Sequence, residues 1–136
     1  MKLTSRPMTP KRFLATEPED VRSAGLSKSK DAYIRNIARA IVDDGLSKRK
    51  LQRLDDLQVI HELTAIKGIG KWTAEMYLMF GLRRLDVVSL GDVGLQRATR
   101  ILYNNGEMDE LLLARVSSAW KPYRTIACWY LWKSTD

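Results

Sequence analysis

The sequence predicts an all-α fold, and three observations support this prediction. Apolar residues recur with the 3.6-residue period of a helix, most clearly at Tyr33, Ile34, Ile37, Ala38 and Ile41. Prolines and glycines stand where helices begin and end, and no segment shows the alternation of a half-buried strand. With 136 residues, 45% of them hydrophobic, the chain can bury a core within one domain.

The first half of the chain predicts three helices in order. Thr9 before Pro10 is typical of an N-cap followed by proline at the first helical position, and "TEPEDVRSAG" repeats this pattern and ends at Gly25. A long core helix then runs from Ser27 to a C-cap at Gly45.

The middle of the chain predicts helices on both sides of a glycine turn. "LSKRKLQRL" forms a short basic helix, and Asp55 caps the next one. The apolar face of that helix is expected to hold Leu57, Ile60 and Leu63. The turn "KGIG" follows, and a helix resumes over residues 71–80, with its inner side expected to hold Trp72, Met76, Tyr77 and Met79 or Phe80.

The last third predicts a loop and three more helices. "GLRRLDVVSLG" has no helical stripe and indicates a crossing loop. A helix is predicted from about Asp92 to Tyr103 by the spacing of its apolar residues Leu95, Ala98, Ile101 and Leu102. Helical spacing predicts another helix in "EMDELLLARVSSAW". Pro122 is expected to open the last helix, with Tyr123, Ile126, Ala127 and Tyr130 at helical spacing.

Charge and cysteine usage narrow the function classes. Residues 1–54 hold 13 Lys/Arg and 6 Asp/Glu, whereas residues 55–136 are neutral in sum. A basic half suits a polyanion such as nucleic acid, although runs such as "SKRK" are also typical of a solvated face. Cys128 has no internal partner and is expected to be a small core residue. We find no signal peptide and no membrane span, and expect a cytoplasmic protein in bacteria or archaea, associated with the nucleoid, or a nuclear one in eukaryotes.

The glycine turn admits three interpretations. Glycine removes side-chain bulk, so that backbone N–H groups at the start of the second helix can meet a phosphate. Carbonyls in the same turn can bind a monovalent cation that bridges to DNA. An ordinary helical hairpin also favours glycine. The spacing of Gly68 and Gly70 alone does not decide among them.

Several separated segments together resemble one family. "LTAIKGIGKWTAEMYLMF" resembles the helix-hairpin-helix of the DNA glycosylase superfamily, and "SLGDVGLQRA" resembles the glycine-rich loop and aspartate that follow it. "GLSKSKDAYIRNIARAI" and "WKPYRTIACWYLW" resemble segments of its DNA-3-methyladenine glycosylase II branch, so the similarity covers about residues 9–132. The resemblance implies one helix-hairpin-helix glycosylase domain over 1–136, with the hairpin at about 56–81 and the catalytic loop and helix start at about 82–95.

The resemblance assigns Asp92 as the catalytic residue and Trp72 to the wall of the base pocket, with Trp129 nearby. An alkylated purine is cationic and leaves readily, so one carboxylate that stabilises the developing sugar cation suffices, and an indole face suits a cationic base. The structural alternatives are a plain N-cap for Asp92 and core packing for the tryptophans. Trp120 and Trp132 are expected to be packing residues.

The resemblance also implies a DNA-binding turn. Its phosphate contacts are expected at Lys67, Gly68, Gly70, Lys71 and Thr73. The carbonyls of Thr64, Ile66 and Gly68 match positions that hold a monovalent cation, Na⁺ or K⁺. Lys67 stands where the family usually has proline, which adds a charge and keeps an N–H.

Two differences from other members of the superfamily indicate which subclass of glycosylase this chain resembles. Trp72 stands where bifunctional members have a nucleophilic lysine, so a monofunctional hydrolase is expected. Cys128 cannot form a four-cysteine iron-sulfur cluster, and no cofactor is expected to be required. The lone His61 is expected to lie at the surface.

A third departure concerns the start of the chain. Family members have further helices ahead of "MTPKRFLATEPED", including the segment that supplies the wedge filling the gap left by a flipped base. This chain is therefore expected to be N-terminally shortened, and to form a homo-oligomer or bind a partner chain that supplies those helices. Its expected partner is double-stranded DNA with alkylated bases. The alternative function is a noncatalytic DNA-binding or interaction module derived from a glycosylase.

Overall fold

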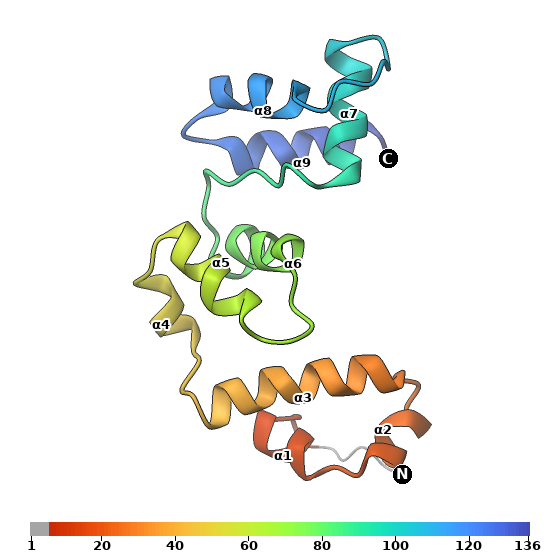
Figure 1. Ribbon diagram of the computed structural model, residues 1–136, viewed down its shortest axis with the longest axis vertical. Helices are drawn as coiled ribbons and strands as arrows, with labels where there is room; N and C mark the ends of the chain where they lie inside the picture. Colours follow the sequence, from red (N-terminus) through yellow and green to blue (C-terminus); the bar gives the residue numbers. More distant parts are fainter. Residues whose placement is uncertain (1–5) are drawn as a thin grey trace. The chain divides into compact units, whose positions relative to one another are not determined.

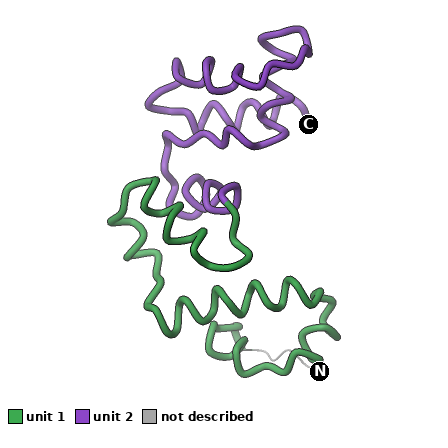
Figure 2. The backbone as a smooth tube through the Cα atoms, viewed as in Figure 1, with its two compact units in different colours: residues 1–70 green, residues 71–136 purple. Residues whose placement is uncertain are grey.

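A computed structural model describes residues 6–136, and every regular element within this range is helical, which confirms the all-α prediction. The chain divides into two compact units, Met1–Gly70 and Lys71–Asp136, shown in different colours in Figure 2. The prediction of one domain over 1–136 stays a prediction, and each unit is described separately. No helix of the described part is both long and apolar enough to cross a membrane.

The first unit contains five helices whose starts follow the predicted caps. They are α1 (Pro10–Ala15), α2 (Pro18–Ser23), α3 (Lys28–Val42), α4 (Lys48–Gln52) and α5 (Asp56–Thr64). Thr9 and Ser27 accept hydrogen bonds from N–H groups in the first turns of α1 and α3. Asp55 and Gln58 form a reciprocal capping box at α5. At α2 the residue before the proline is Glu17, which makes no side-chain cap bond.

In the first unit α1 and α2 pack along α3, as Figure 1 shows, and α4 and α5 contribute the buried residues Leu51, Val59 and Leu63. Val59 and Leu63 of α5 are buried, but Leu57 is 79% exposed, so the predicted apolar face of α5 was wrong at Leu57. The buried stripe runs through Val59 and Leu63, which are four residues apart, whereas Leu57 lies on a different side of the helix.

The second unit consists of α6 (Lys71–Met76), a π-helical turn η1 (Tyr77–Gly81), α7 (Val93–Tyr103), α8 (Leu112–Ser117), a 3₁₀ turn η2 (Ser118–Trp120) and α9 (Arg124–Ser134). Helix α7 packs against α8 and α9. The last helix begins at Arg124 rather than at Pro122, with Tyr123 as its N-cap residue.

The faces predicted for α6 and η1 were partly wrong. Ala74, Glu75, Leu78 and Met79 are buried, whereas Trp72 and Phe80 are more than half exposed. The π-helical turn contributes to this difference, because the N–H of Leu82 bonds to the carbonyl of Tyr77, five residues earlier. The wider turn changes which side chains point inward relative to an ideal 3.6-residue period.

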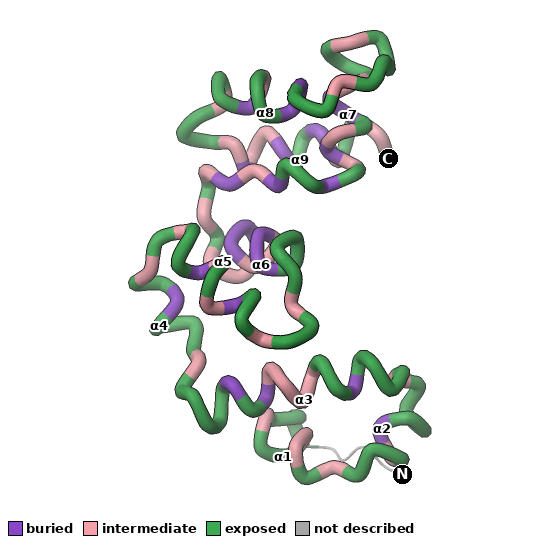
Figure 3. Tube along the Cα trace, in the orientation of Figure 1, coloured by how far each residue is buried: buried purple, intermediate pink, exposed green. Residues whose placement is uncertain are grey.

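The faces predicted for α7 and α9 were also partly wrong, as the buried residues, purple in Figure 3, show. In α7, Leu95 and Ala98 are buried as predicted, but Ile101 and Leu102 are exposed and Thr99 is buried in their place. In α9 the buried residues are Thr125, Cys128 and Leu131, whereas the predicted stripe at Tyr123 and Tyr130 is exposed. Cys128 is a core residue, as predicted.

The loop from 82 to 92 is tied to the start of α9. The N–H of Val87 donates to the hydroxyl of Thr125 at 2.9 Å, and that hydroxyl donates to the carbonyl of Arg84 at 2.8 Å. The guanidinium of Arg124 donates to both carboxylate oxygens of Asp86, at 2.8 and 3.1 Å. These bonds hold the loop that ends at Asp92.

Candidate active site

Asp92 ends this loop and caps α7. Its Oδ1 accepts the N–H of Leu95 at 2.8 Å, which is the N-cap bond predicted as one alternative. The side chain nevertheless has more partners than a cap requires, and the residue is only 8% exposed. The capping bond therefore fixes a carboxylate in place without using all of its acceptor capacity.

Two indole groups complete the hydrogen bonding of Asp92. Nε1 of Trp72 donates to Oδ2 at 2.7 Å, and Nε1 of Trp132 donates to Oδ1 at 3.0 Å. Each carboxylate oxygen can accept about two hydrogen bonds, so these contacts fill Oδ1 and leave one acceptor position on Oδ2. The structure thus holds Asp92 in one orientation and leaves part of Oδ2 for another group.

The hydrogen bonds also decide the charge of Asp92. Burial by itself raises the pKa of the carboxyl group, but the bonds from Trp72, the N–H of Leu95 and Trp132, with the nearby N–H of Gly94 adding to their effect, outweigh it, and the pKa is lowered. Asp92 is therefore ionised at neutral pH despite its burial. The dipole at a helix start also favours a negative charge at this position.

Gly94 permits the close approach of Trp132 to Asp92. A Cβ atom at Gly94 would lie 3.2 Å from Oδ1 of Asp92 and 3.2 Å from Cδ1 of Trp132. Both neighbours would have to move by a few tenths of an ångström. The glycine after Val93 is thus part of the packing around the carboxylate.

An aromatic surface continues from Trp132. The ring of Phe80 stacks on Trp132 at 6.2 Å and on Trp129 at 6.1 Å between centroids. Phe80 and Trp129 line an open cavity of about 410 Å³ together with Met79, Arg83 and Leu85. Phe80 thus connects Trp129 with Trp132 beside the carboxylate, whereas Trp120 packs against Tyr103.

A second buried acid lies in the same unit. Glu75 is 6% exposed, and its Oε1 accepts a hydrogen bond from the hydroxyl of Ser89 at 3.1 Å. Burial raises the pKa of Glu75, the Ser89 bond and Lys71 lower it, and the charge of Asp92 raises it further, with a net upward shift. The pKa values of the two acids are thus shifted in opposite directions.

The glycine turn of the first unit is closely packed on one side and open on the other. Gly68 has φ +105°, and a Cβ there would lie 2.2 Å from the ring of Tyr33, so two independent constraints require glycine. The side chain of Asn36 donates to the carbonyl of Lys67 at 3.0 Å. A Cβ at Gly70 would meet nothing within 4 Å. The backbone at Gly70 is therefore accessible.

The carbonyls predicted to bind a cation lie in this turn. That of Ile66 accepts the N–H of Ile69 at 3.0 Å, and no hydrogen bond of the described residues engages those of Thr64 and Gly68. Carbonyl oxygens of this kind suit a hard monovalent cation. Lys67 in this unit, and Lys71 and Thr73 at the start of α6, are exposed, and their roles at a phosphate stay predictions.

Trp132 and Phe80 were missed as site residues, because both were interpreted as packing residues. One signal in the sequence was available for Trp132. It follows Trp129 by three residues on the last helix, so the two share a face. Because Trp129 is expected near the base pocket, Trp132 should have been expected there too. The hydrogen bond to Asp92, 40 positions away, is visible only in the structure.

The site is a buried, ionised aspartate that lies beside exposed aromatic rings and follows a helix, a glycine turn and a second helix in the sequence. Residues 1–122 match the profile of the HhH-GPD superfamily base excision DNA repair protein, and the chain belongs to this family. It is 34% identical over 129 residues to DNA-3-methyladenine glycosylase 1 of Schizosaccharomyces pombe, covering 93% of this chain and 57% of that protein.

Two solved structures share the fold and a substantial part of the sequence. A DNA-3-methyladenine glycosidase from Bacillus halodurans superposes with a TM-score of 0.86 at 48% identity, over 94% of this chain and 59% of that one. The S. pombe 3-methyladenine DNA glycosylase Mag1, in complex with abasic DNA, superposes with a TM-score of 0.84 at 34% identity, over 93% and 63%. This chain thus spans about 60% of the length of these relatives.

Proposed function

We propose that this chain takes part in base excision repair as a monofunctional DNA-3-methyladenine glycosylase, which hydrolyses the N-glycosidic bond of alkylated, cationic purines. The observation that carries the proposal is the Asp92 carboxylate, buried, ionised and held by the indoles of Trp72 and Trp132. A cap alone needs only the bond to Leu95. The family and the named activities of its relatives support the same reaction.

Asp92 acts on the sugar in this reaction. The bond between C1′ and the base nitrogen breaks, its electron pair leaves with the base, and the cationic purine departs as a neutral molecule. Positive charge then develops on the deoxyribose, and a fixed carboxylate stabilises it most strongly where water is largely excluded. The acceptor position left on Oδ2 can orient the water whose oxygen bonds to C1′ and which releases its proton to solvent.

The exposed aromatic rings hold the base in this proposal. Trp72 is 53% and Phe80 56% exposed, although Nε1 of Trp72 is bonded to Asp92 and Phe80 stacks on Trp129 and Trp132. A cationic purine gains about 0.5–2 kcal/mol from the face of such a ring, more than a neutral base gains. Trp129 lines the neighbouring cavity, where it can contact the nucleotide around the lesion.

The glycine turn is proposed to bind the DNA backbone. Its open side at Gly70 leaves room for a phosphate to approach the backbone N–H groups, and Lys67 adds a positive charge. The carbonyls of Thr64, Ile66 and Gly68 are proposed to hold Na⁺ or K⁺ that bridges to the same strand. Double-stranded DNA is the partner in this reaction, and the proposed location is the compartment that contains it.

A matched pair of variants at Gly70 tests the turn. Gly70→Asp introduces a carboxylate at the open side, so binding to every duplex sequence should weaken by at least ten-fold, whereas Gly70→Ala fits the open space and should bind more nearly like the wild type. Fluorescence anisotropy with a methylated and an unmethylated duplex measures both. Equal binding by Gly70→Asp and the wild type would contradict the proposed role of the turn.

A base-release assay distinguishes the enzyme from a noncatalytic DNA-binding module. The wild-type chain should release free 3-methyladenine from alkylated duplex DNA, and release should depend on Asp92. Binding without release, at any protein concentration, would favour the module.

The proposal also includes association of this chain with a second copy of itself. In the first unit, Ile41 and Val42 of α3 are 39% and 37% exposed, and an apolar groove lies beside them between Met8, Phe13 and Ile37. Burial of such surface is favourable by roughly 25 cal/mol per Å². We therefore propose a dimer at micromolar concentration, which sedimentation velocity tests. A monomer at every concentration would contradict it.

A further inference from the structure

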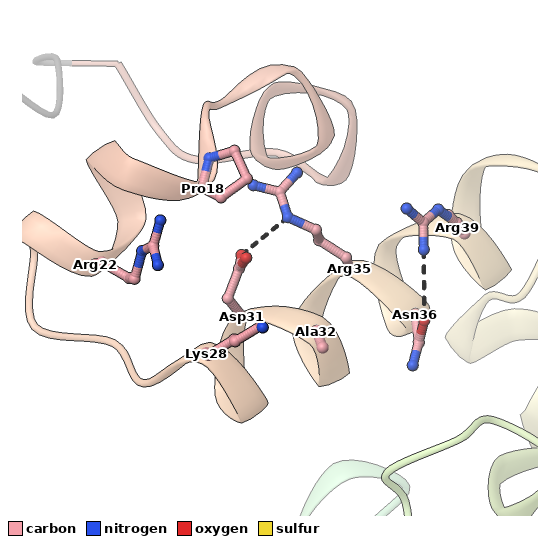
Figure 4. A pocket seen from close by; sticks show the side chains of 8 residues that line it. All are labelled: Pro18, Arg22, Lys28, Asp31, Ala32, Arg35, Asn36 and Arg39. Atoms are coloured by element: carbon pink, nitrogen blue, oxygen red, sulfur yellow. Dashed lines mark hydrogen bonds and ion pairs between the residues drawn. The ribbon is translucent and has the colours of Figure 1, made fainter.

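A basic groove between α2 and α3 has no role in the site described above. It has a volume of about 430 Å³, and its lining includes Arg22 of α2 and Lys28, Asp31, Arg35 and Arg39 of α3. Figure 4 shows these side chains around the cavity. We call it the α2–α3 groove. All of its lining residues belong to the first unit.

Two of the charged residues in the α2–α3 groove neutralise each other. Nε of Arg35 donates to Oδ1 of Asp31 at 2.9 Å, and both side chains are largely buried. The guanidinium of Arg35 also donates to the carbonyls of Leu14 at 3.2 Å and Thr16 at 2.6 Å, at the end of α1. Arg35 thus has a structural role, and it leaves no charge for a ligand.

The other three cations remain uncompensated. No ion pair of the described residues involves Arg22, Lys28 or Arg39, and all three are exposed. The acids of α2, Glu19 and Asp20, do not line the cavity. Because Asp31 offsets only Arg35, the groove keeps a positive charge, and a concave site with such a charge concentrates anions where the surrounding protein screens the field less than water does.

One side chain connects the α2–α3 groove to the glycine turn. Asn36 donates through Nδ2 to the carbonyl of Lys67, and its Oδ1 lies 3.5 Å from Nη1 of Arg39. Arg39 therefore lies beside the turn proposed to bind phosphate. Lys28 is 11 positions before Arg39 on α3, which is about 16 Å along the helix axis.

The length of this row matches a run of nucleic-acid backbone. One strand of duplex DNA presents a phosphate about every 3.4 Å of its axis, so a row of cations about 16 Å long, from Lys28 to Arg39, can meet more than one phosphate. Guanidinium groups such as those of Arg22 and Arg39 also suit phosphate, since they donate in a planar fork. An acidic protein segment is the less favoured ligand, because the cations lie in a row that adjoins the turn.

We propose that the α2–α3 groove is a second phosphate-binding site, which contacts the backbone of the same DNA beyond the glycine turn through Arg22, Lys28 and Arg39. This inference rests on the proposed function, because it requires that the chain bind DNA. The site reads no base edges, so it adds affinity and orientation without sequence preference. It extends the bound length of DNA along α3.

Salt dependence of DNA binding tests the proposal in the full chain. Each phosphate bound by the protein contributes about 0.9 to the slope of log K against log [salt], so a groove variant with Arg22→Gln, Lys28→Gln and Arg39→Gln should reduce the slope by about 2–3. By the same relation the affinity at 0.1 M salt should fall roughly eight-fold for each phosphate that the variant no longer binds. The decrease should be equal for methylated and unmethylated duplexes.

The matched control removes three charges elsewhere in the same unit. Lys30→Gln, Lys48→Gln and Arg49→Gln change exposed residues that do not line the α2–α3 groove, so the net charge falls equally. Thermal melting of both triple variants verifies that each one folds. A groove variant whose slope equals that of the control overturns the inference. The inference is also overturned if the groove variant binds DNA like the wild type but no longer binds a polyglutamate peptide that the wild type binds.

The Gly70→Asp variant separates the two proposals. If the wild type binds no duplex, the proposed function fails. If it binds, and Gly70→Asp weakens binding while the groove variant behaves like the control, only the second site is refuted.

Discussion

Replacing Asp92 with asparagine tests the catalytic assignment most directly, because it removes the charge but little of the volume. Three donors surround the carboxylate, two at Oδ1 and the indole of Trp72 at Oδ2. An asparagine that keeps its oxygen toward Leu95 and Trp132 turns its NH₂ group toward the N–H of Trp72. Two donors then face each other, so one charge-assisted hydrogen bond is lost and no new one replaces it.

The magnitude follows from the bonds that change. A hydrogen bond to a charged group contributes about 1.5–3 kcal/mol, so we expect Asp92→Asn to lower the free energy of unfolding by roughly that amount at pH 7. Loss of the charge that stabilises the sugar cation should slow base release by at least about 10²–10³-fold, by analogy with the removal of one electrostatic contact from a preorganised site. Binding to undamaged duplex should be nearly unchanged.

The pH dependence supplies an independent measurement. The pKa of Asp92 in the folded chain is lower than the ordinary value of 3.8, so its ionised form stabilises the fold above the ordinary pKa. That contribution is lost as the pH falls through the ordinary value towards the lowered one. The stability difference between the wild type and Asp92→Asn, measured by urea unfolding, should therefore be full at pH 7 and shrink below about pH 4.

The assay combines single-turnover release of 3-methyladenine with urea unfolding of both proteins. Trp72→Phe is the matched variant, since it removes the same hydrogen bond and keeps the charge of Asp92. It should lose stability similarly but retain more base release than Asp92→Asn. Unchanged release in Asp92→Asn would refute the catalytic role, and equal stability at pH 7 would refute the account of the hydrogen bonds.

Three further variants test the packing around the two sites. Gly94→Ala should push Trp132 away from the carboxylate and slow release roughly ten-fold, with a small loss of stability, as measured by the same release assay. Glu75→Gln removes a buried carboxyl group whose pKa is raised by burial, so urea unfolding should show the variant to be more stable than the wild type at pH 7. This gain in stability should vanish as the pH falls below 4.5, the ordinary pKa of the group. Gly68→Ala combines a positive φ with a clash against Tyr33 and should lower the free energy of unfolding by at least about 1–3 kcal/mol, whereas an unchanged value would contradict the packing of the turn.

Local patterns in the sequence were sufficient for the starts of several helices. Thr9, Ser27 and Asp55 cap the helices that they were predicted to cap, because a capping bond spans only three residues and depends on neighbours in the chain. The C-cap predicted at Gly45 was wrong by two residues, because α3 ends at Val42 with Asp43 as its C-cap, although Gly45 does have the positive φ of +69°. The family was likewise evident from separated motifs, and the comparisons confirmed it.

Helix faces were harder to predict than helix ends. Leu57 and Tyr130 belong to helices that do form, yet both are exposed, whereas the less apolar Thr99 and Thr125 are buried. Burial depends on which neighbouring elements pack against a helix, and the polar threonines are tolerated inside because their hydroxyls bond to Leu95 and Arg84 carbonyls. Periodicity in one segment contains no information on those partners.

The sequence by itself determined that this chain is helical, that it belongs to a DNA repair family, and that Asp92 follows a glycine-rich turn. Only the tertiary structure decided how that aspartate is held. Its bonds to Trp72 and Trp132 join residues 20 and 40 positions apart, and they keep the buried carboxyl ionised. Such bonds form because the loop, α6 and α9 pack within one unit, and the free energy of that packing is distributed over many residues that no local pattern specifies.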